Sequence, residues 1–483
     1  TAENPNLRCR AIDIDEKTSQ ENILKEINRH ISDSYHNNYQ TAYRDNIRYA
    51  QQLDILDPEK EEKQELALKK QGIYIITGGA GGIGFTLAEY LARKEPRIKI
   101  ALLGRAKELS QAKKDIIKRI EKETGARINY YATDITDPNN LKRVIKKIKE
   151  QYPNNDIRGL VLSAGLAGDG FLIQKEETTF RQVISPKMAG TNNLMGSLSQ
   201  EPLDLVLFCS SSTSVFPVPG QGDYTAANAY LDAWAKQGTI TRNKGKKDSR
   251  KEKEKEVRQD NIKILSLNWS AWQEVGMAKA YGADKDEFTQ AISPQQAVKA
   301  LDGLLKRNIS HTNILVGKLN YSDQYLMNNS NELFIGLSQP IRQTLDQKKK
   351  PSIIPKPSTP EEAPVALKGR KNKDYTQTEQ KIAQVWHQVL GHKEYDINDN
   401  FFEIGGDSLK IIQVQKELDK FYPGKLSVAR LFTYPTIAQL AGYLENSTDN
   451  KLIKKNNKIK ELIRRIKEDE LSVDEAIKDI ETI

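Results

Sequence analysis

From residue 73 to residue 318, short apolar runs alternate with segments whose apolar residues recur at helical spacing. This alternation is typical of a parallel sheet with helices on both faces, because every strand is then buried. The expected strands are Ile73–Thr77, Ile98–Leu103, Ile128–Ala132, Gly159–Ser163, Leu203–Cys209, Ile262–Leu267 and Asn313–Val316. The pattern therefore predicts an α/β domain with an open, doubly wound parallel sheet.

Residues 1–71 carry too few elements for a complete domain. We expect a strand at Leu7–Ile14, a helix at Glu21–Ile31 and an extended stretch at Thr41–Leu53. These elements predict a partial subdomain in front of the α/β domain, which we assign to residues 72–340.

Residues 341–374 are rich in Lys, Pro, Ser and Thr and lack periodicity, which is typical of a linker. A small helical domain is expected at residues 375–446, with Gly391 as the C-cap of its first helix. One face of that helix carries Ile382, Val385, Trp386, Val389 and Leu390. Residues 447–483 predict a helical tail of two short amphipathic helices. Its segment 451–483 docks onto another polypeptide, begins an intermodular linker or packs against the small domain.

The 483 residues exceed the size of one hydrophobic core, so two or three domains are expected. The net charge of +9 would favour nucleic acid, but the basic residues cluster in connectors such as 243–258 and 348–356. The run 243–258 mixes with acids and neither run contains aromatic residues, so they predict solvated loops and no nucleic-acid partner.

Two distant cysteines and five scattered histidines offer neither a disulfide framework nor a metal site. No apolar run approaches the roughly 20 residues that span a bilayer. We therefore expect a soluble, cytoplasmic protein with no metal and no membrane partner. The first residue, Thr1, indicates a segment of a longer protein.

A glycine-rich segment follows the first strand of the α/β domain and leads into a helix. It consists of Thr77, Gly78, Gly79, Ala80, Gly81, Gly82, Ile83 and Gly84. Glycines let the backbone approach a pyrophosphate, whose charge is stabilised at the helix N-terminus. The placement between strand and helix predicts a Rossmann-type dinucleotide site.

The end of the second strand indicates which dinucleotide binds. Arg105 stands where an acidic residue would bind a free ribose 2′-hydroxyl, and its charge suits a 2′-phosphate instead. NADPH is therefore favoured over NADH. Asp134 is expected at the adenine, and Ser163, Ala164 and Gly165 end the fourth strand against the cofactor.

A serine and a tyrosine can converge on one carbonyl oxygen after the fifth strand. Ser211 follows that strand closely, Tyr224 opens a helix thirteen residues beyond Ser211, and Asn228 lies one helical turn further on. Reduction needs the carbonyl oxygen to be protonated, so the tyrosine must be more acidic than its usual pKa of about 10. Lys187 is the expected ammonium that achieves this.

Residues 73–318 resemble the ketoreductase domains of modular polyketide synthases, within the short-chain dehydrogenase/reductase superfamily. The matching stretches are TGGAGGIG, SPKMAGTNNL, FCSSSTSVFPVPGQGDYTAANAYLDAWA and LNWSAWQEVGMA. The superfamily usually carries lysine four residues after the tyrosine, where Asn228 stands here, and the ketoreductase branch exchanges these positions. The resemblance implies Tyr224 as proton donor, Ser211 as carbonyl partner, Lys187 as electrostatic activator and Asn228 as orienting group.

The same resemblance bears on the N-terminus and on stereochemistry. Residues 1–71 look like the closing part of the structural subdomain that precedes such catalytic domains. Asp169 keeps the last aspartate of the family's Leu-Asp-Asp motif, and Phe216 replaces the tryptophan of the opposite class. These two residues imply a B-type reductase with a D-configured β-hydroxyl product.

In the small domain, Ser408 follows a glycine pair and an aspartate at the start of a helix. A phosphodiester is stabilised there by the helix dipole, and no nearby histidine would activate the serine as a nucleophile. The region resembles the acyl or peptidyl carrier domains of polyketide and nonribosomal peptide synthases, with the ending LFTYPTIAQLAGYL. The resemblance implies that Ser408 carries 4′-phosphopantetheine.

The leading hypothesis is reduction of a β-ketoacyl thioester on phosphopantetheine with NADPH. Its partners would be acyl thioesters and other synthase domains, namely ketosynthase, acyltransferase and phosphopantetheinyl transferase. A silent reductase scaffold with a working carrier, or a hybrid nonribosomal module, are the alternatives. A thioester-releasing reductase would normally follow the carrier, and here the order is reversed.

Overall fold

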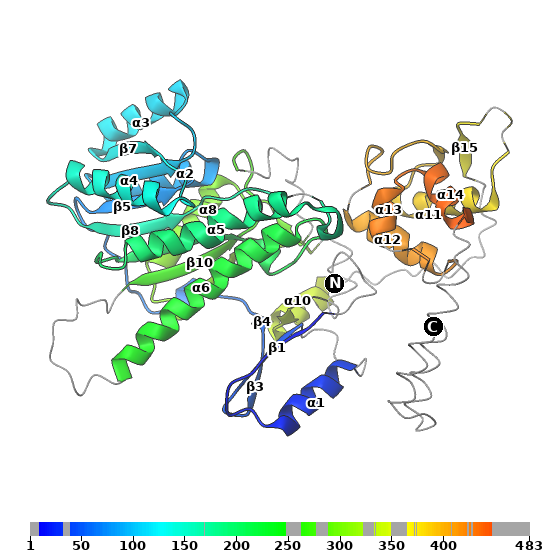
Figure 1. Cartoon of the computed structure of the whole chain (residues 1–483), viewed down its shortest axis with the longest axis horizontal. Coiled ribbons are helices and arrows are strands. Elements are labelled where there is room, and N and C mark those ends of the chain that lie inside the picture. Colours follow the sequence, from blue (N-terminus) through cyan, green and yellow to red (C-terminus); the bar gives the residue numbers. More distant parts are fainter. Residues whose placement is uncertain are drawn as a thin grey trace. The chain divides into compact units, whose positions relative to one another are not determined.

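The computed structural model describes residues 9–31, 39–168, 170–247, 262–276, 288–321, 333, 335–348, 365–370, 372, 374–406, 408–422, 425–426 and 428–446 (Figure 1). The chain divides into two compact units, one mainly of residues 7–354 and one mainly of residues 355–483. The predicted tail helices in 447–483 lie outside the described residues. No described helix has the length and apolar character needed to cross a membrane.

A seven-stranded parallel sheet forms the centre of the first unit, in the order β12-β10-β9-β8-β5-β6-β7. Its strands are β5 (Ile73–Thr77), β6 (Lys99–Gly104), β7 (Arg127–Ala132), β8 (Ile157–Leu162), β9 (Leu205–Ser211), β10 (Lys263–Trp269) and β12 (Asn313–Val316). All seven predicted strands are present, so the Rossmann-type fold is confirmed. The strand order reverses between β5 and β8, which is where such sheets bind ligands.

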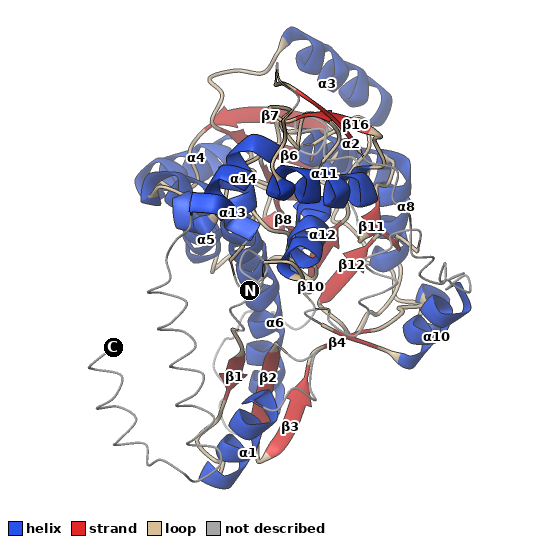
Figure 2. Cartoon of the chain, turned by 90° about the vertical axis from the view of Figure 1, so that its right-hand side faces the viewer, coloured by secondary structure: helices blue, strands red, loops and turns tan. Residues whose placement is uncertain are grey.

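Helices cover both faces of this sheet (Figure 2). One face packs on α2 (Gly82–Lys94), α3 (Gln111–Thr124) and α8 (Pro294–Leu305), and the other on α4 (Pro138–Gln151), α5 (Glu177–Ser197) and α6 (Gly222–Lys247). Successive β5 residues alternate between the two cores, as the period of a strand requires: Tyr74 and Ile76 face the first, and Ile73 and Ile75 the second. Both faces are therefore apolar, which explains the continuous apolar runs.

The N-terminal elements form a small mixed sheet beside one helix. They are β1 (Ala11–Asp13), α1 (Gln20–Ile31), β2 (Gln40–Arg44) and β3 (Ile47–Ala50). Strand β1 is parallel to β2, and β2 is antiparallel to β3. Inside this layer the buried Glu26 carboxylate accepts hydrogen bonds from Arg48 and Tyr43.

Short elements complete the first unit. They are β4 (Gln52–Leu53), η1 (Pro58–Lys60), η2 (Leu172–Gln174), η3 (Ser212–Ser214), β11 (Thr289–Gln290), β13 (Lys318–Leu319), β14 (Gly336–Leu337) and α10 (Gln339–Lys348). Strand β14 pairs with β4, which ties the end of the unit to its beginning.

The second unit is a small helical domain. Its elements are β15 (Ala366–Lys368), α11 (Gln377–Leu390), β16 (Glu394–Asp396), α12 (Ser408–Asp419), α13 (Val428–Thr433) and α14 (Ile437–Asn446). Helix α11 begins at a capping box of Thr376 and Glu379 and ends at Gly391, whose φ of 82° is left-handed. The core of this domain contains Trp386, whose ring centroid lies 5.0 Å from that of Phe401. The small helical domain expected from the sequence is present.

Candidate active site and carrier site

The glycine-rich loop lies between β5 and α2, as predicted. Gly78 has a φ of +62°, a conformation that side chains rarely adopt. Gly84 makes the closest contact, because a Cβ atom there would lie 2.5 Å from Ser163 Oγ. The loop can therefore pack against the end of β8 only with glycine at this position.

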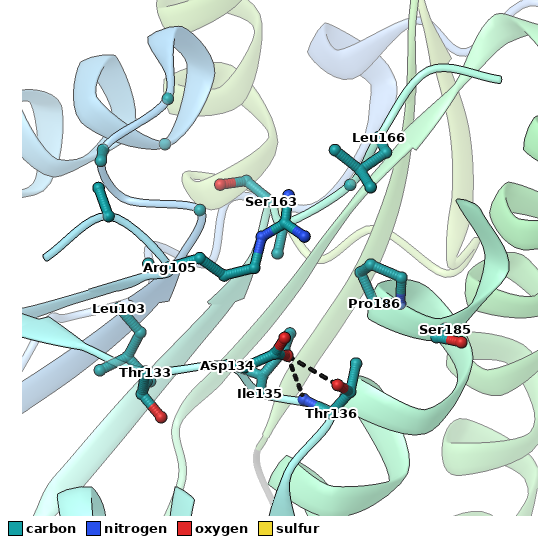
Figure 3. A pocket seen from close by; sticks show the side chains of 18 of the residues that line it. Leu103, Arg105, Thr133, Asp134, Ile135, Thr136, Ser163, Leu166, Ser185 and Pro186 are labelled. Atoms are coloured by element: carbon teal, nitrogen blue, oxygen red, sulfur yellow. Dashed lines mark hydrogen bonds between the residues drawn. The ribbon is translucent and has the colours of Figure 1, made fainter. Parts of the chain in front are cut away.

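A cavity of about 610 Å³ opens at this edge of the sheet (Figure 3). Most of the predicted cofactor residues line it: Gly78, Ala80, Gly81, Gly82, Ile83, Gly84, Arg105, Asp134, Ser163, Ala164 and Gly165. Thr77 lies behind the wall, where its backbone oxygen accepts a hydrogen bond from Ser163 and its hydroxyl accepts one from the Ala164 amide. Gly79 donates its amide hydrogen to Leu103 at 3.1 Å. Thr77 and Gly79 therefore bond to residues that line the cavity without lining it themselves.

Further lining residues were not singled out by the sequence. They are Leu103, Gly104, Ala106, Thr133, Ile135, Thr136, Leu166, Arg181, Gln182, Ser185, Pro186 and Gly276. Ser185 and Pro186 of α5 directly precede Lys187, so the motif SPKMAGTNNL contained a signal for these two residues. Arg181, which adds a second cation, is four residues further upstream and had no such signal.

Arg105 and Asp134 place opposite charges in the cavity. The Arg105 side chain extends over the cavity in Figure 3 and is exposed. Asp134 Oδ1 accepts hydrogen bonds from the backbone and the hydroxyl of Thr136, at 2.9 and 2.7 Å. Close-packed glycine backbone, a flexible cation and a fixed carboxylate fit the pyrophosphate, a ribose phosphate and an adenine amino group of a dinucleotide.

Ser211, Tyr224 and Asn228 come together at the end of β9 and the start of α6. The expectation of an unusually acidic tyrosine is wrong for this structure: burial raises the pKa of Tyr224 above its ordinary value, while hydrogen bonds with the Ser211 and Asn228 side chains act to lower it. The Asn228 amide donates to the Tyr224 backbone oxygen at 2.8 Å, and its buried Oδ1 has no hydrogen-bond partner. Such an orphaned acceptor fits a site that binds a further donor, such as water or a ligand.

Lys187 reaches the same strand end from α5. Its Nζ donates to the carbonyl oxygen of Cys209 at 2.8 Å, and only 4% of the residue is exposed. Burial lowers the pKa of Lys187 to about 8, against an opposing attraction from Asp232. The structure thus places the Lys187 ammonium at the carbonyl of Cys209, which precedes Ser211 by two residues in the chain.

Asp232 belongs to a polar network that was not expected from the sequence analysis. Its carboxylate accepts hydrogen bonds from Ser214, Ser266 and Asn268 at 2.6–2.7 Å. Asn268 also donates to Ser210 at 3.2 Å. The network joins β9 and β10 to α6 two turns beyond Tyr224, so it holds the helix in register with the strand end.

Of the two residues predicted to control stereochemistry, the structure describes Phe216. Asp169 lies outside the described residues. Phe216 is 2% exposed and stacks on Phe288 with ring centroids 5.1 Å apart, in a cluster that includes Ile335 and Leu345. Its ring is therefore core, outside the lining of the described cavity.

In the helical domain, Ser408 is the first residue of α12, as predicted from the glycine pair before it. Gly405 has a φ of +99°, and a Cβ on Gly406 would lie 2.3 Å from the Phe401 ring. The turn before Ser408 therefore requires both glycines. The helix start places this serine, which the sequence predicts to be the attachment site, at the positive end of the helix dipole.

Comparison with known proteins gives two family matches. Residues 72–274 match the KR domain model, and residues 380–444 match the model for a phosphopantetheine attachment site. The second match indicates 4′-phosphopantetheine as a covalent group, and the KR fold implies a nicotinamide cofactor.

Curated relatives include two polyketide synthases of Bacillus subtilis (strain 168). PksN is 26% identical over 456 residues, and PksL is 26% identical over 470 residues. Each alignment covers 93% of this chain but only 8% of PksN and 9% of PksL. The chain thus spans under a tenth of the length of these relatives.

Similar solved structures include two ketoreductases. The N-terminal ketoreductase from the macrolactin assembly line is 29% identical, with a TM-score of 0.53 over 67% of this chain and 59% of that chain. A ketoreductase domain from the bacillaene assembly line is 25% identical, with a TM-score of 0.51 over 64% of this chain and 70% of that chain. The chain is therefore a KR domain followed by a phosphopantetheine-binding carrier domain, and its relatives are polyketide synthases.

Proposed function

We propose that this chain reduces a β-ketoacyl thioester, held on the phosphopantetheine of Ser408, to the β-hydroxyacyl thioester with NADPH. Residues 72–340 would be the reductase and residues 375–446 the carrier. The observation that carries the proposal is the convergence of Ser211, Tyr224 and Asn228 by hydrogen bonds at the strand edge that also bears the glycine-lined cavity.

The cofactor, when bound, supplies hydride to the carbonyl carbon. Tyr224 donates its hydroxyl proton to the carbonyl oxygen, and Ser211 donates a hydrogen bond to the same oxygen. The raised pKa of Tyr224, caused by burial, keeps the hydroxyl protonated at neutral pH. Together, the two hydroxyls stabilise the negative charge that develops on the oxygen as the bond to carbon forms.

Lys187 and Asn228 support the proton donor. In this proposal the Lys187 ammonium lowers the energy of the tyrosinate that forms when Tyr224 gives up its proton. Asn228 fixes the first turn of α6 by its bond to the Tyr224 backbone, and its free Oδ1 can accept from water that resupplies the proton. Arg105 would hold the 2′-phosphate that distinguishes NADPH from NADH.

We further propose a D-configured product, of the B-type, on the ground that Asp169 keeps part of the family's motif. The burial of Phe216 in a separate core cluster leaves Asp169 as the main support for this assignment. Chiral chromatography of the released β-hydroxy acid decides it, because an L-configured product would overturn the assignment.

We propose that the reduction takes place in the cytoplasm. Ketosynthase and acyltransferase domains would deliver the acyl thioesters, and a phosphopantetheinyl transferase would load the carrier.

Two alternative functions make different predictions. A silent reductase scaffold would bind the carrier without consuming NADPH. A hybrid nonribosomal module would accept an aminoacyl-derived thioester in place of a purely acyl one.

Intact-protein mass spectrometry tests the proposal. The carrier is loaded with a β-ketoacyl-phosphopantetheine group by a phosphopantetheinyl transferase and incubated with or without NADPH. Reduction adds hydride and proton, so a gain of about 2 Da is expected only with NADPH. The gain should vanish in Tyr224→Phe, and no gain in the unaltered chain would favour the silent scaffold.

A further inference from the structure

An ion pair sealed from solvent lies directly beside Tyr224. Lys175 Nζ is 2.7 Å from Asp223 Oδ2, and the two side chains are 2% and 0% exposed. Removing two charges from water is costly, and the pair is stable only when its geometry is good and its remaining atoms are bonded. None of the proposed catalytic roles uses either residue.

Asp223 links the ion pair to the proton donor. It lies in the first turn of α6, and its second oxygen, Oδ1, accepts a hydrogen bond from the Tyr224 backbone amide at 2.8 Å. One carboxylate thus satisfies an unpaired amide at the helix start and neutralises Lys175. The backbone of Tyr224 is thereby connected, through Asp223, to the segment of chain that carries Lys175.

Lys175 ends the loop that begins at the cavity wall. Gly165 and Leu166 line the cavity, and Lys175 follows η2 at the far end of the same loop. Between them, Gly168 is buried against the ion pair: a Cβ atom there would lie 2.5 Å from Asp223 Oδ2 and 2.6 Å from Oδ1. The loop therefore packs on the carboxylate at two points.

A second contact supports the same docking. A Cβ atom on Gly222 would lie 2.7 Å from Leu172 Cδ1, so the loop also rests on the residue before Asp223. Leu172 and Ile173 are nevertheless 46% and 82% exposed, which leaves an apolar surface next to the anchored loop. An acyl chain entering the site would meet such a surface.

We propose that the Lys175–Asp223 pair is a positioning device that locks residues 166–168 and 170–175 onto the start of α6 and so sets substrate affinity and the face of the ketone presented for reduction. This inference rests on the proposed function. This segment begins at Leu166 in the cavity wall and ends at Lys175 beside the start of α6, where Tyr224 supplies the proton. A shift of the segment by about 1 Å would therefore misplace the substrate carbonyl relative to the proton donor. Neither residue takes part in proton or hydride transfer.

The test uses the full chain with Lys175→Met and Asp223→Asn. Both should raise KM for a β-ketoacyl thioester by about tenfold, with a smaller fall in kcat, and should erode the ratio of the two alcohol configurations. KM for NADPH should rise less than KM for the thioester, because only Leu166 of this segment lines the cofactor cavity and neither member of the pair does. Lys94→Met is the matched control, since Lys94 pairs with Asp302 away from this loop; it should alter thermal stability without altering the alcohol ratio.

The double variant Lys175→Met with Asp223→Asn leaves no charge unpaired, so it supplies the same kinetics if a single variant fails to fold. A folded variant with unchanged KM and unchanged alcohol ratio would overturn the inference. If the unaltered chain does not reduce any thioester, the proposed function fails. Hydrogen exchange in peptides covering 166–175 then decides the anchoring by itself: faster exchange in Lys175→Met supports it, and unchanged exchange refutes it.

Discussion

Lys187 Nζ donates a hydrogen bond to the carbonyl oxygen of Cys209 at 2.8 Å, at the strand end that also carries Ser211. The residue is nearly inaccessible, and burial lowers its pKa to about 8. A buried ammonium with one neutral acceptor is unfavourable for folding. The proposed catalytic role of Lys187 therefore opposes its effect on stability, and this opposition can be measured.

Lys187→Met should stabilise the protein and impair it as a reductase. The folded pKa is lowered, so the unfolded state binds more protons between about pH 8 and the ordinary lysine value of 10.5. The free-energy cost of burying the charged lysine is therefore present at pH 7, and it is lost as the pH rises from about 8 to 10.5. Removing it should raise the free energy of unfolding at pH 7 by up to about 3 kcal/mol, measured by urea denaturation. A destabilised variant that keeps full activity would contradict the assignment.

The rate of reduction should depend on pH through the same lysine. Burial raises the pKa of Tyr224, so its proton remains available while Lys187 loses its charge above about pH 8. The kcat/KM for a small ketone should be flat below that pH and fall by up to about tenfold per pH unit above it. The step should be missing in Lys187→Met, and a profile that stays flat to pH 10 would count against the ammonium.

Arg105→Glu should change the preference between the two nicotinamide cofactors. The exposed guanidinium lines the cavity, and replacing it by a carboxylate repels a 2′-phosphate while leaving a free 2′-hydroxyl an acceptor. KM for NADPH should rise about a hundredfold, and KM for NADH should change much less. Lys118→Glu makes the same charge change on the exposed face of α3 and should leave both constants unaltered.

Gly159→Ala should destabilise the reductase domain. A Cβ at this β8 position would lie 2.2 Å from the Tyr74 ring, which is fully buried between strand and helix. Overpacking of this kind costs about 1–3 kcal/mol. Gly303→Ala is the matched control in α8, where nothing lies within 4 Å of the new methyl, and it should stabilise by about 0.5–1 kcal/mol. Thermal midpoints of the two variants should move in opposite directions.

Ser408→Ala should abolish phosphopantetheine attachment without unfolding the carrier domain. Alanine keeps the start of α12, since the turn before it depends on Gly405 and Gly406. Mass spectrometry after treatment with a phosphopantetheinyl transferase and coenzyme A should show no added group, while circular dichroism stays unchanged. Ser427→Ala, a serine upstream of α13, should still be modified. Modification of the Ser408→Ala chain would place the attachment site elsewhere.

Local patterns in the sequence were sufficient for the seven strands, the glycine-rich loop and the caps of α11. Buried parallel strands must be apolar on both faces, so their positions show as continuous apolar runs such as Ile73–Thr77. The turn at Gly78 and the cap at Gly391 depend on backbone conformations that few other residues adopt. Motif spacing likewise indicated Ser211, Tyr224 and Asn228, because the strand end and the helix start are consecutive in the chain.

Contacts between distant segments were decided only by the tertiary structure. Lys175 and Asp223 are 48 positions apart and meet because β8 and β9 are neighbours in the sheet, so the segments that follow them emerge at one edge. Phe216 follows the catalytic strand closely, yet it packs on Phe288 in a cluster with residues near 340. Sequence periodicity reports which face of an element is apolar, because that follows from local geometry. Which other element covers that face depends on strand order and packing, and these exist only once the whole chain has folded.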